Sequence, residues 1–290
     1  MVATGVVPGA PREQPGVAHG GVEPNIEPNV EPMLVVDQRG TECRITLNRP
    51  QKHNPLSRSL LDELGAAIAR AGSDPATNYI LLCGAGERYF AAGGDLRDLA
   101  AVRSESETLE MVTAARDALD TVRRSHCQVI AYLNGDAIGG GAELAVACDL
   151  RLMAPHAHIG FVQSRLAITS AWGGGPDLCA LVGASRALRM MARAELIDAG
   201  TALNWGLADA VVADGPDGED AGRFLGPFRK LPRDLLFALK EQTAAWRFGQ
   251  PYDERRALEQ RAIVASWTHP NHWDAVERLL SRPSTVTEQK

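Results

Sequence analysis

The chain has 290 residues with a formal net charge of −6, and it is 45% hydrophobic and 23% charged. This balance suits a globular protein with a sizeable core, and it provides no basic face for nucleic acid. No apolar stretch is long enough to cross a bilayer, and no basic segment followed by an apolar one opens the chain as a secretory signal would. The five cysteines are widely spaced, without a Cys-x-x-Cys pair, so we expect reduced core cysteines in a cytoplasmic protein.

Residues 1–32 differ in composition from the rest of the chain. They are rich in Pro, Gly and Glu, and they contain a short tandem of Val-Glu-Pro and Ile-Glu-Pro units. Repeated prolines interrupt both helices and strand pairing, so we predict a disordered tail.

Strand and helix patterns alternate from Leu34 onward. Residues 41–47 alternate apolar and polar side chains, as a half-buried strand does. Ser57 is placed to cap an amphipathic helix that ends near Gly72. Further strands are predicted at 79–83, 129–133 and 150–154, and further helices at 105–124 and 142–148. The alternation predicts an α/β core over residues 33–226, and helical patterns dominate a C-terminal region over residues 227–290.

Two glycine-rich loops carry the strongest functional signal. One runs from Asn134 to Leu144 and contains three consecutive glycines before Glu143, and the other runs from Phe90 to Leu96. Each leads into a helix start, where backbone N–H groups lack internal partners and favour a negative oxygen. Asp95 is placed to cap the helix that follows the Phe90 loop. The pair of loops, with one carboxylate beside them, predicts an enzyme that stabilises an enolate.

Other uses of glycine-rich loops fit less well. No Gly-Lys pair followed by Ser or Thr is present for a phosphate-binding loop, and Tyr89 stands where a dinucleotide fingerprint needs its third glycine. The segment 183–187 fails as a nucleophile elbow at its last position. His156 and His158 lack an acidic third ligand at zinc spacing, so we interpret them as surface or packing residues.

The chain resembles the crotonase (enoyl-CoA hydratase/isomerase) superfamily from Leu34 to about Leu280. Four blocks carry the resemblance: residues 47–56, 90–96, 134–149 and 171–174. It implies a ββα spiral core, C-terminal helices that form trimers or hexamers, and an acyl thioester substrate, usually of coenzyme A, with no tightly bound cofactor. It also implies that the N–H groups of Gly94 and Gly140 hold the thioester oxygen.

The resemblance further implies a set of residues that contact the substrate or its coenzyme A. Lys52 is a candidate phosphate partner, although a solvated lysine is nearly as good an interpretation. A C-terminal lysine that contacts the cofactor of a neighbouring subunit is not obvious, so a carrier-protein thioester stays open. The remaining contacts are expected at His53, Asn54, Leu56, Phe90, Ala92, Gly93, Asp95, Gly139 and Trp172.

Hydratases of this superfamily use two glutamates, and the sequence departs from that pattern. The first matches Glu143, whereas an ungapped reading places Gln163 at the second. A glutamine amide orients a neighbouring group but cannot cycle a proton at neutral pH. Trp172 replaces a smaller residue and either shapes the acyl pocket or packs in the core.

We therefore favour decarboxylation of a short alkylmalonyl-CoA, a reaction that needs one acid and no base. The chain is similar to the ethylmalonyl-CoA decarboxylase-like members in residues 140–153, 159–163 and 171–174. Glu143 is then the proton-transfer group, Gly94 and Gly140 donate to the enolate, and Gln163 orients. The alternatives are an enoyl-CoA hydratase with a single glutamate and, in another class, a non-catalytic acyl-thioester binder. RNA binding, known in some members, is disfavoured by the acidic charge balance.

Overall fold

The computed structural model describes residues 1–2, 5 and 31–281. The predicted tail therefore lies almost entirely outside the described residues. The helices and strands that the structure describes all lie between Leu34 and Leu280.

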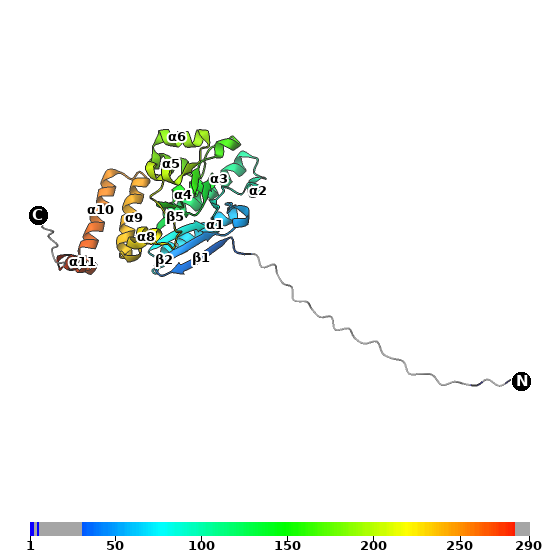
Figure 1. Ribbon diagram of the computed structural model, residues 1–290, viewed down its shortest axis with the longest axis horizontal. Coiled ribbons are helices and arrows are strands. Elements are labelled where there is room, and N and C mark those ends of the chain that lie inside the picture. Colours follow the sequence, from blue (N-terminus) through cyan, green and yellow to red (C-terminus); the bar gives the residue numbers. More distant parts are fainter. Residues whose placement is uncertain (3–4, 6–30, 282–290) are drawn as a thin grey trace. The chain divides into compact units, whose positions relative to one another are not determined.

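Two sheets form the core (Figure 1). The larger has the order β1-β2-β3-β5-β7-β10, with β1 and β2 antiparallel and the other neighbours parallel. Its strands are β1 (Leu34–Arg39), β2 (Glu42–Leu47), β3 (Tyr79–Gly84), β5 (Gln128–Leu133), β7 (Leu150–Met153) and β10 (Ala210–Val211). The smaller sheet has the order β4-β6-β8-β9, with strands β4 (Tyr89–Ala91), β6 (Asp136–Ile138), β8 (His158–Gly160) and β9 (Ile197–Asp198).

The chain visits the two sheets in turn. β3 is followed by β4, β5 by β6 and β7 by β8, so each turn places one strand in each sheet before a helix begins. This arrangement confirms the predicted α/β class and ββα spiral. Strands β4 and β6 lie inside segments that we predicted as loops, because three-residue strands are too short to show a period in the sequence.

Helices surround the sheets and make up the C-terminal part of the chain. The helices are α1 (Arg58–Ser73), α2 (Leu96–Leu99), α3 (Glu105–Arg123), α4 (Gly140–Ala147), α5 (Gly174–Val182), α6 (Ala184–Arg193), α7 (Ala199–Trp205), α8 (Glu219–Lys230), α9 (Arg233–Arg247), α10 (Tyr252–Trp267) and α11 (Pro270–Leu280), with 3-10 turns η1 (Pro50–Lys52) and η2 (Gln163–Leu166). The predicted Ser57 cap is confirmed, since its side chain accepts from Leu60 N at 3.3 Å.

The prediction that the strand at residues 41–47 is half-buried was wrong, since nearly all of β2 is buried. Side chains on both faces of β2 are buried, and Glu42 and Arg44 are buried with the apolar residues. The polar side chains are tolerated because they pair with each other: Arg44 Nε donates to Glu42 Oε1 at 2.8 Å. An alternating pattern thus marks a buried ion pair here and not a solvent face.

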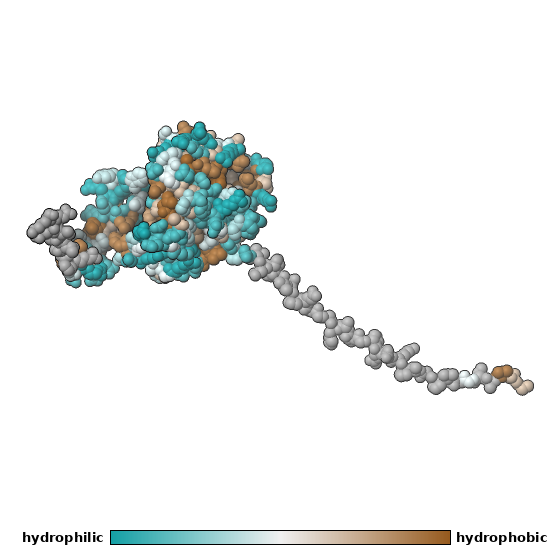
Figure 2. Space-filling model, viewed as in Figure 1, coloured by the Kyte–Doolittle hydropathy of each residue, from teal (hydrophilic) through white to brown (hydrophobic). Residues whose placement is uncertain are grey.

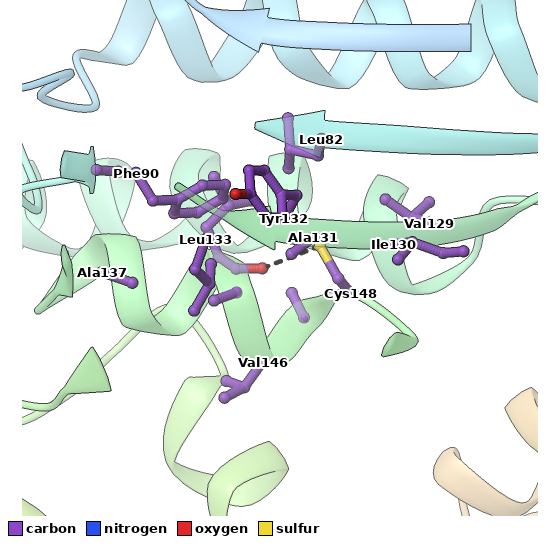
Figure 3. Close-up of a cluster of buried hydrophobic side chains, with 14 of the residues drawn as sticks. Leu82, Phe90, Val129, Ile130, Ala131, Tyr132, Leu133, Ala137, Val146 and Cys148 are labelled. Carbon is purple, nitrogen blue, oxygen red and sulfur yellow. Dashed lines mark hydrogen bonds between the residues drawn. The ribbon is translucent and has the colours of Figure 1, made fainter. Parts of the chain in front are cut away.

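Helix α4 is packed directly on the central strands. All eight of its residues are buried. Figure 3 shows Val146 of α4 and the adjoining Cys148 in one cluster with β5 side chains, Leu82 and Phe90. This packing holds the N-terminus of α4 rigidly against the sheets, which matters because the candidate site is built there.

The last helices leave the core. α9 contacts β5, α10 contacts α9, and α11 contacts α10 (Figure 1). Several large apolar side chains on these helices are exposed, and Figure 2 shows some brown surface in this part of the molecule. They include Trp246, Ile263, Val264, Trp267 and Trp273. Within residues 1–2, 5 and 31–281, no helix has the length and hydrophobicity that a membrane span requires.

Candidate active site

The first part of the site is the turn from β6 into α4. Gly139 has φ +57° and its N–H donates to Gly160 O at 2.9 Å, which anchors the turn on β8. Helix α4 then begins at Gly140, and Glu143 lies in its first turn. Because the first N–H groups of a helix have no partner within it, this turn presents donors toward the opposite loop.

The second part is the loop after β4. Leu56 N donates to Gly93 O at 2.8 Å and Asp95 N donates to Leu56 O at 3.0 Å. The residues before and after Gly94 are therefore both hydrogen-bonded to Leu56. Asp95 caps α2 as expected, by accepting from Arg97 N, and its carboxylate pairs with Arg49 at 3.0 Å. The loop is therefore held in place by the block around Leu56.

The two loops meet. A methyl group added to Gly93 would lie 3.1 Å from Ile138 O and 3.5 Å from Gly140 N. In the part of the chain that the structure describes, neither Gly94 N nor Gly140 N donates a hydrogen bond to a protein acceptor. Gly94 and Gly140 therefore lie close together on separate loops, and among the described residues neither N–H has a protein acceptor, which is the combination that an oxyanion site requires.

The indole ring of Trp172 covers both donors. Trp172 is buried, and a methyl group on Gly94 would lie 3.4 Å from its Cη2 atom. A methyl group on Gly140 would overlap the same ring, which explains why glycine is needed at that position. The ring therefore packs against the backbone of both glycines.

Glu143 is bound by the backbone of the loop that carries Trp172 and is 2% exposed. Its Oε2 accepts from Trp172 N at 2.8 Å and from Gly174 N at 3.0 Å, and its Oε1 accepts from Gln163 Nε2 at 2.9 Å. A methyl group on Gly174 would lie 2.5 Å from Glu143 Cγ, so glycine is needed there for the backbone to reach the carboxylate. The carboxyl group is thus fully hydrogen-bonded, and all three donors are neutral.

Burial is the dominant influence on this acid. Removal from water raises the pKa of Glu143 above its ordinary value of 4.5, and the N–H groups of Gly174, Trp172 and Ala171 and the Gln163 amide oppose that rise without cancelling it. A carboxyl group with a raised pKa retains a proton more readily and is a better general acid near neutral pH.

The predicted coenzyme A residues fall into two groups. Lys52 and His53 are exposed, and the His53 ring contacts the Tyr89 ring in a tilted arrangement with centroids 4.5 Å apart. Asn54 is buried, and its side chain accepts from Arg49 N and donates to Ala85 O and Tyr89 O. The others lie in the backbone framework: Leu56 and Phe90 are buried, and Ala92 N donates to His53 O.

Sequence reasoning missed the residues that hold the loop over Glu143. Arg123 Nη2 donates to Trp172 O at 2.9 Å, and Arg116 Nη2 donates to Ala171 O at 3.1 Å. Both arginines lie on α3, seven residues or about two turns apart, so they share one face. That spacing is a signal in the sequence, but the backbone carbonyls they contact cannot be read from it.

Comparisons with known proteins find related enzymes. The family model for enoyl-CoA hydratase/isomerase matches residues 38–263. The chain is 31% identical to an ethylmalonyl-CoA decarboxylase of Xenopus tropicalis over 77% of this chain and 75% of that protein. It is 34% identical to a crotonyl-CoA hydratase of Syntrophomonas wolfei over 62% and 68%. The crystal structure of an enoyl-CoA hydratase from Bacillus anthracis superposes with a TM-score of 0.79 at 28% identity, covering 86% of this chain and 96% of that one.

Proposed function

The chain belongs to the enoyl-CoA hydratase/isomerase family, and from this membership we propose that it is a lyase that decarboxylates a short alkylmalonyl-CoA. The proposal is carried by one observation: Glu143 is a buried acid with neutral partners, and Gln163 occupies the position next to it. A site with one acid suits a reaction that needs a proton donor and no base.

The two loop N–H groups would stabilise the intermediate. In the proposed reaction the thioester oxygen accepts from Gly94 N and Gly140 N. The bond between Cα and the carboxylate breaks, CO₂ leaves, and the electron pair becomes an enolate whose charge is held by these donors. Loss of one donor of this kind raises a barrier by about 3 kcal/mol.

Glu143 would complete the reaction. Its proton passes to Cα, which yields the saturated acyl-CoA, and the carboxylate then regains a proton from water. The raised pKa of Glu143 supports this role, because the protonated form must be populated before each turnover.

Gln163 suits both states of this acid. When Glu143 is ionised, Gln163 Nε2 donates to it, as at present. After a half-turn of the amide, the Gln163 oxygen accepts from the protonated carboxyl. A second carboxylate would instead repel the ionised form. We propose that Gln163 orients Glu143 in this way and does not itself transfer a proton.

Trp172 supports a short acyl group. Its ring lies against both Gly94 and Gly140, so an alkyl substituent on Cα meets an indole wall close to the reacting carbons. We propose that coenzyme A enters along the exposed Lys52 and His53 side of the first loop, with Gly93, Gly139 and the buried framework residues shaping the channel.

Hydration of an enoyl-CoA is the second candidate. It is favoured by the hydrogen bond between Gln163 and Glu143, because an amide beside a carboxylate is able to orient a water molecule. In that reaction Glu143 must begin ionised, whereas decarboxylation needs it protonated.

The two reactions are distinguished by substrate and by pH. Purified protein is offered ethylmalonyl-CoA and crotonyl-CoA separately, with CO₂ release and enone absorbance as readouts. We expect CO₂ release that slows as the alkyl chain lengthens and as the pH rises through the pKa of Glu143. Loss of enone absorbance without CO₂ release from any alkylmalonyl-CoA would favour hydration, and saturable binding without either reaction would favour an acyl-thioester binder. Malonyl thioesters on a carrier protein, run in parallel, test the choice of carrier.

A further inference from the structure

The loop of residues 171–174 performs two tasks at once. Its N–H groups at Trp172 and Gly174 bind the same oxygen of Glu143, and its indole ring covers the two glycine donors. Two N–H groups separated by one residue are turned toward one oxygen, with Gly173 between them at φ +87°. The carbonyl groups of the same loop are bound from outside it.

Two arginines of α3 hold these carbonyls. Ala171 O and Trp172 N–H belong to the same peptide group, so the bond from Arg116 and the bond to Glu143 lie at opposite ends of that group. A donor on the carbonyl polarises the peptide group and strengthens the hydrogen bond that the N–H at its other end donates. Arg123 holds the next carbonyl, Trp172 O, in the peptide between the two N–H donors.

Arg123 has a buried guanidinium group that is hydrogen-bonded on all three of its nitrogens. Its side chain is 5% exposed, and each nitrogen of the guanidinium has a separate partner: Nε donates to Asp177, Nη1 to Asp120 and Nη2 to Trp172 O. A methyl group on Gly173, which has φ +87°, would lie 2.8 Å from Arg123 Nη2, so the guanidinium packs closely against the loop backbone. A lysine has one nitrogen and does not occupy all three directions.

The network continues to the C-terminal helices. Asp177, in the first turn of α5, also pairs with Arg247 of α9 at 2.9 Å. Arg247 in turn donates to Val146 O and Ala147 O at the end of α4, the helix that carries Glu143. The arginines of α3 and α9 that face the loop pair with Asp120 and Asp177 or donate to backbone carbonyls, and the groups that donate to Glu143 are neutral.

We propose that Arg123, held by Asp177, is a positioning residue that fixes the 171–174 loop and thereby the orientation and acidity of Glu143. The inference rests on the proposed role of Glu143 as the proton donor. It predicts an effect that general destabilisation does not produce. The loop N–H groups hold the pKa of Glu143 down, so loosening them raises that pKa further.

The test compares Arg123→Gln and Arg123→Lys with Arg44→Gln. Arg44 is a matched control, since its side chain is 7% exposed and lies in an ion-pair network around Glu42. For both Arg123 variants we expect kcat to fall about tenfold or more with little change in KM, and the alkaline limb of the pH profile to move up by about one pH unit. For Arg44→Gln we expect a lower melting temperature with the kcat and pH profile of the parent.

A spectroscopic arm separates this inference from the proposed function. In protein with ¹³C-labelled glutamate, the carboxyl signal of Glu143 is identified by its loss in Glu143→Gln and titrated without substrate. A higher titration midpoint in Arg123→Lys supports the positioning role even if no decarboxylation is found. If the Arg123→Gln protein does not fold, Arg123→Lys and the exposed Arg116→Gln replace it, the latter with a smaller shift of the same sign. An unchanged Glu143 midpoint in folded Arg123→Lys and Arg116→Gln would overturn the inference.

Discussion

Two buried glutamates in this chain are held in opposite ways. Glu42 and Glu143 are each 2% exposed. Glu42, on β2, is surrounded by cations: Arg44 lies 2.6 Å and Arg229 3.2 Å from it, and Tyr79 Oη donates to it at 2.6 Å. Glu143, on α4, receives three neutral donors.

We propose that the difference separates a structural acid from a reactive one. The Glu42 network ties α8 and the segment before it to the sheet, because Arg229 of α8 donates to Glu42 and Arg44 donates to Asp217. Burial and the hydrogen bond to Glu42 also raise the pKa of Tyr79, so that hydroxyl stays protonated. The neutral donors orient Glu143, and they lower its pKa by less than burial raises it. Burial alone therefore does not mark a functional acid, whereas burial without a counter-ion does.

The largest expected effect is on turnover. We expect Glu143→Gln to lower kcat by about 10²–10⁴-fold, because the amide cannot give up a proton at neutral pH. Its oxygen still accepts from Trp172 N and Gly174 N, so the fold should be retained. Steady-state kinetics and circular dichroism on the same preparation check this. Parent-like turnover in a folded variant would remove Glu143 from the mechanism.

The matching change at the other glutamate should act on stability. We expect Glu42→Gln to lower the free energy of unfolding by about 3 kcal/mol, because Arg229 loses its anionic partner and the buried Arg44 keeps only Asp217. Urea unfolding measures the loss, and kcat per folded molecule is the control. A marked fall in kcat with unchanged stability would contradict the division between the two acids.

A smaller effect is expected in the pH dependence of stability. Because the pKa of Glu143 is raised on folding, the folded state holds more protons than the unfolded state between the unfolded value near 4.5 and the folded value. The free energy of unfolding contributed by Glu143 therefore falls as pH rises through that window, and is highest below it. Glu143→Gln should abolish this fall. Urea unfolding of both proteins from about pH 4 to about pH 8 tests the sign, and parallel curves would refute it.

Much of the fold was predictable because it depends on local patterns. The Ser57 cap, the apolar strand at 79–83 and the buried helix at Glu143 are all set by residues close together in the chain. The two glycine loops were recognisable for the same reason. The burial of β2 was not predictable, because an alternating pattern does not show whether a polar side chain will meet solvent or an ion-pair partner such as Arg44 of the same strand or Arg229 of α8.

The sequence by itself determined the chemistry that is available: one acid at Glu143, glycines that free two N–H groups, and an amide at Gln163. Only the tertiary structure decided how these groups act together. It placed the indole of Trp172 over both glycines, turned two loop N–H groups onto one oxygen of Glu143, and set Arg123 against the carbonyl between them. The physical reason is that backbone N–H and C=O groups carry no residue identity, so contacts made through them become visible only when the chain is folded.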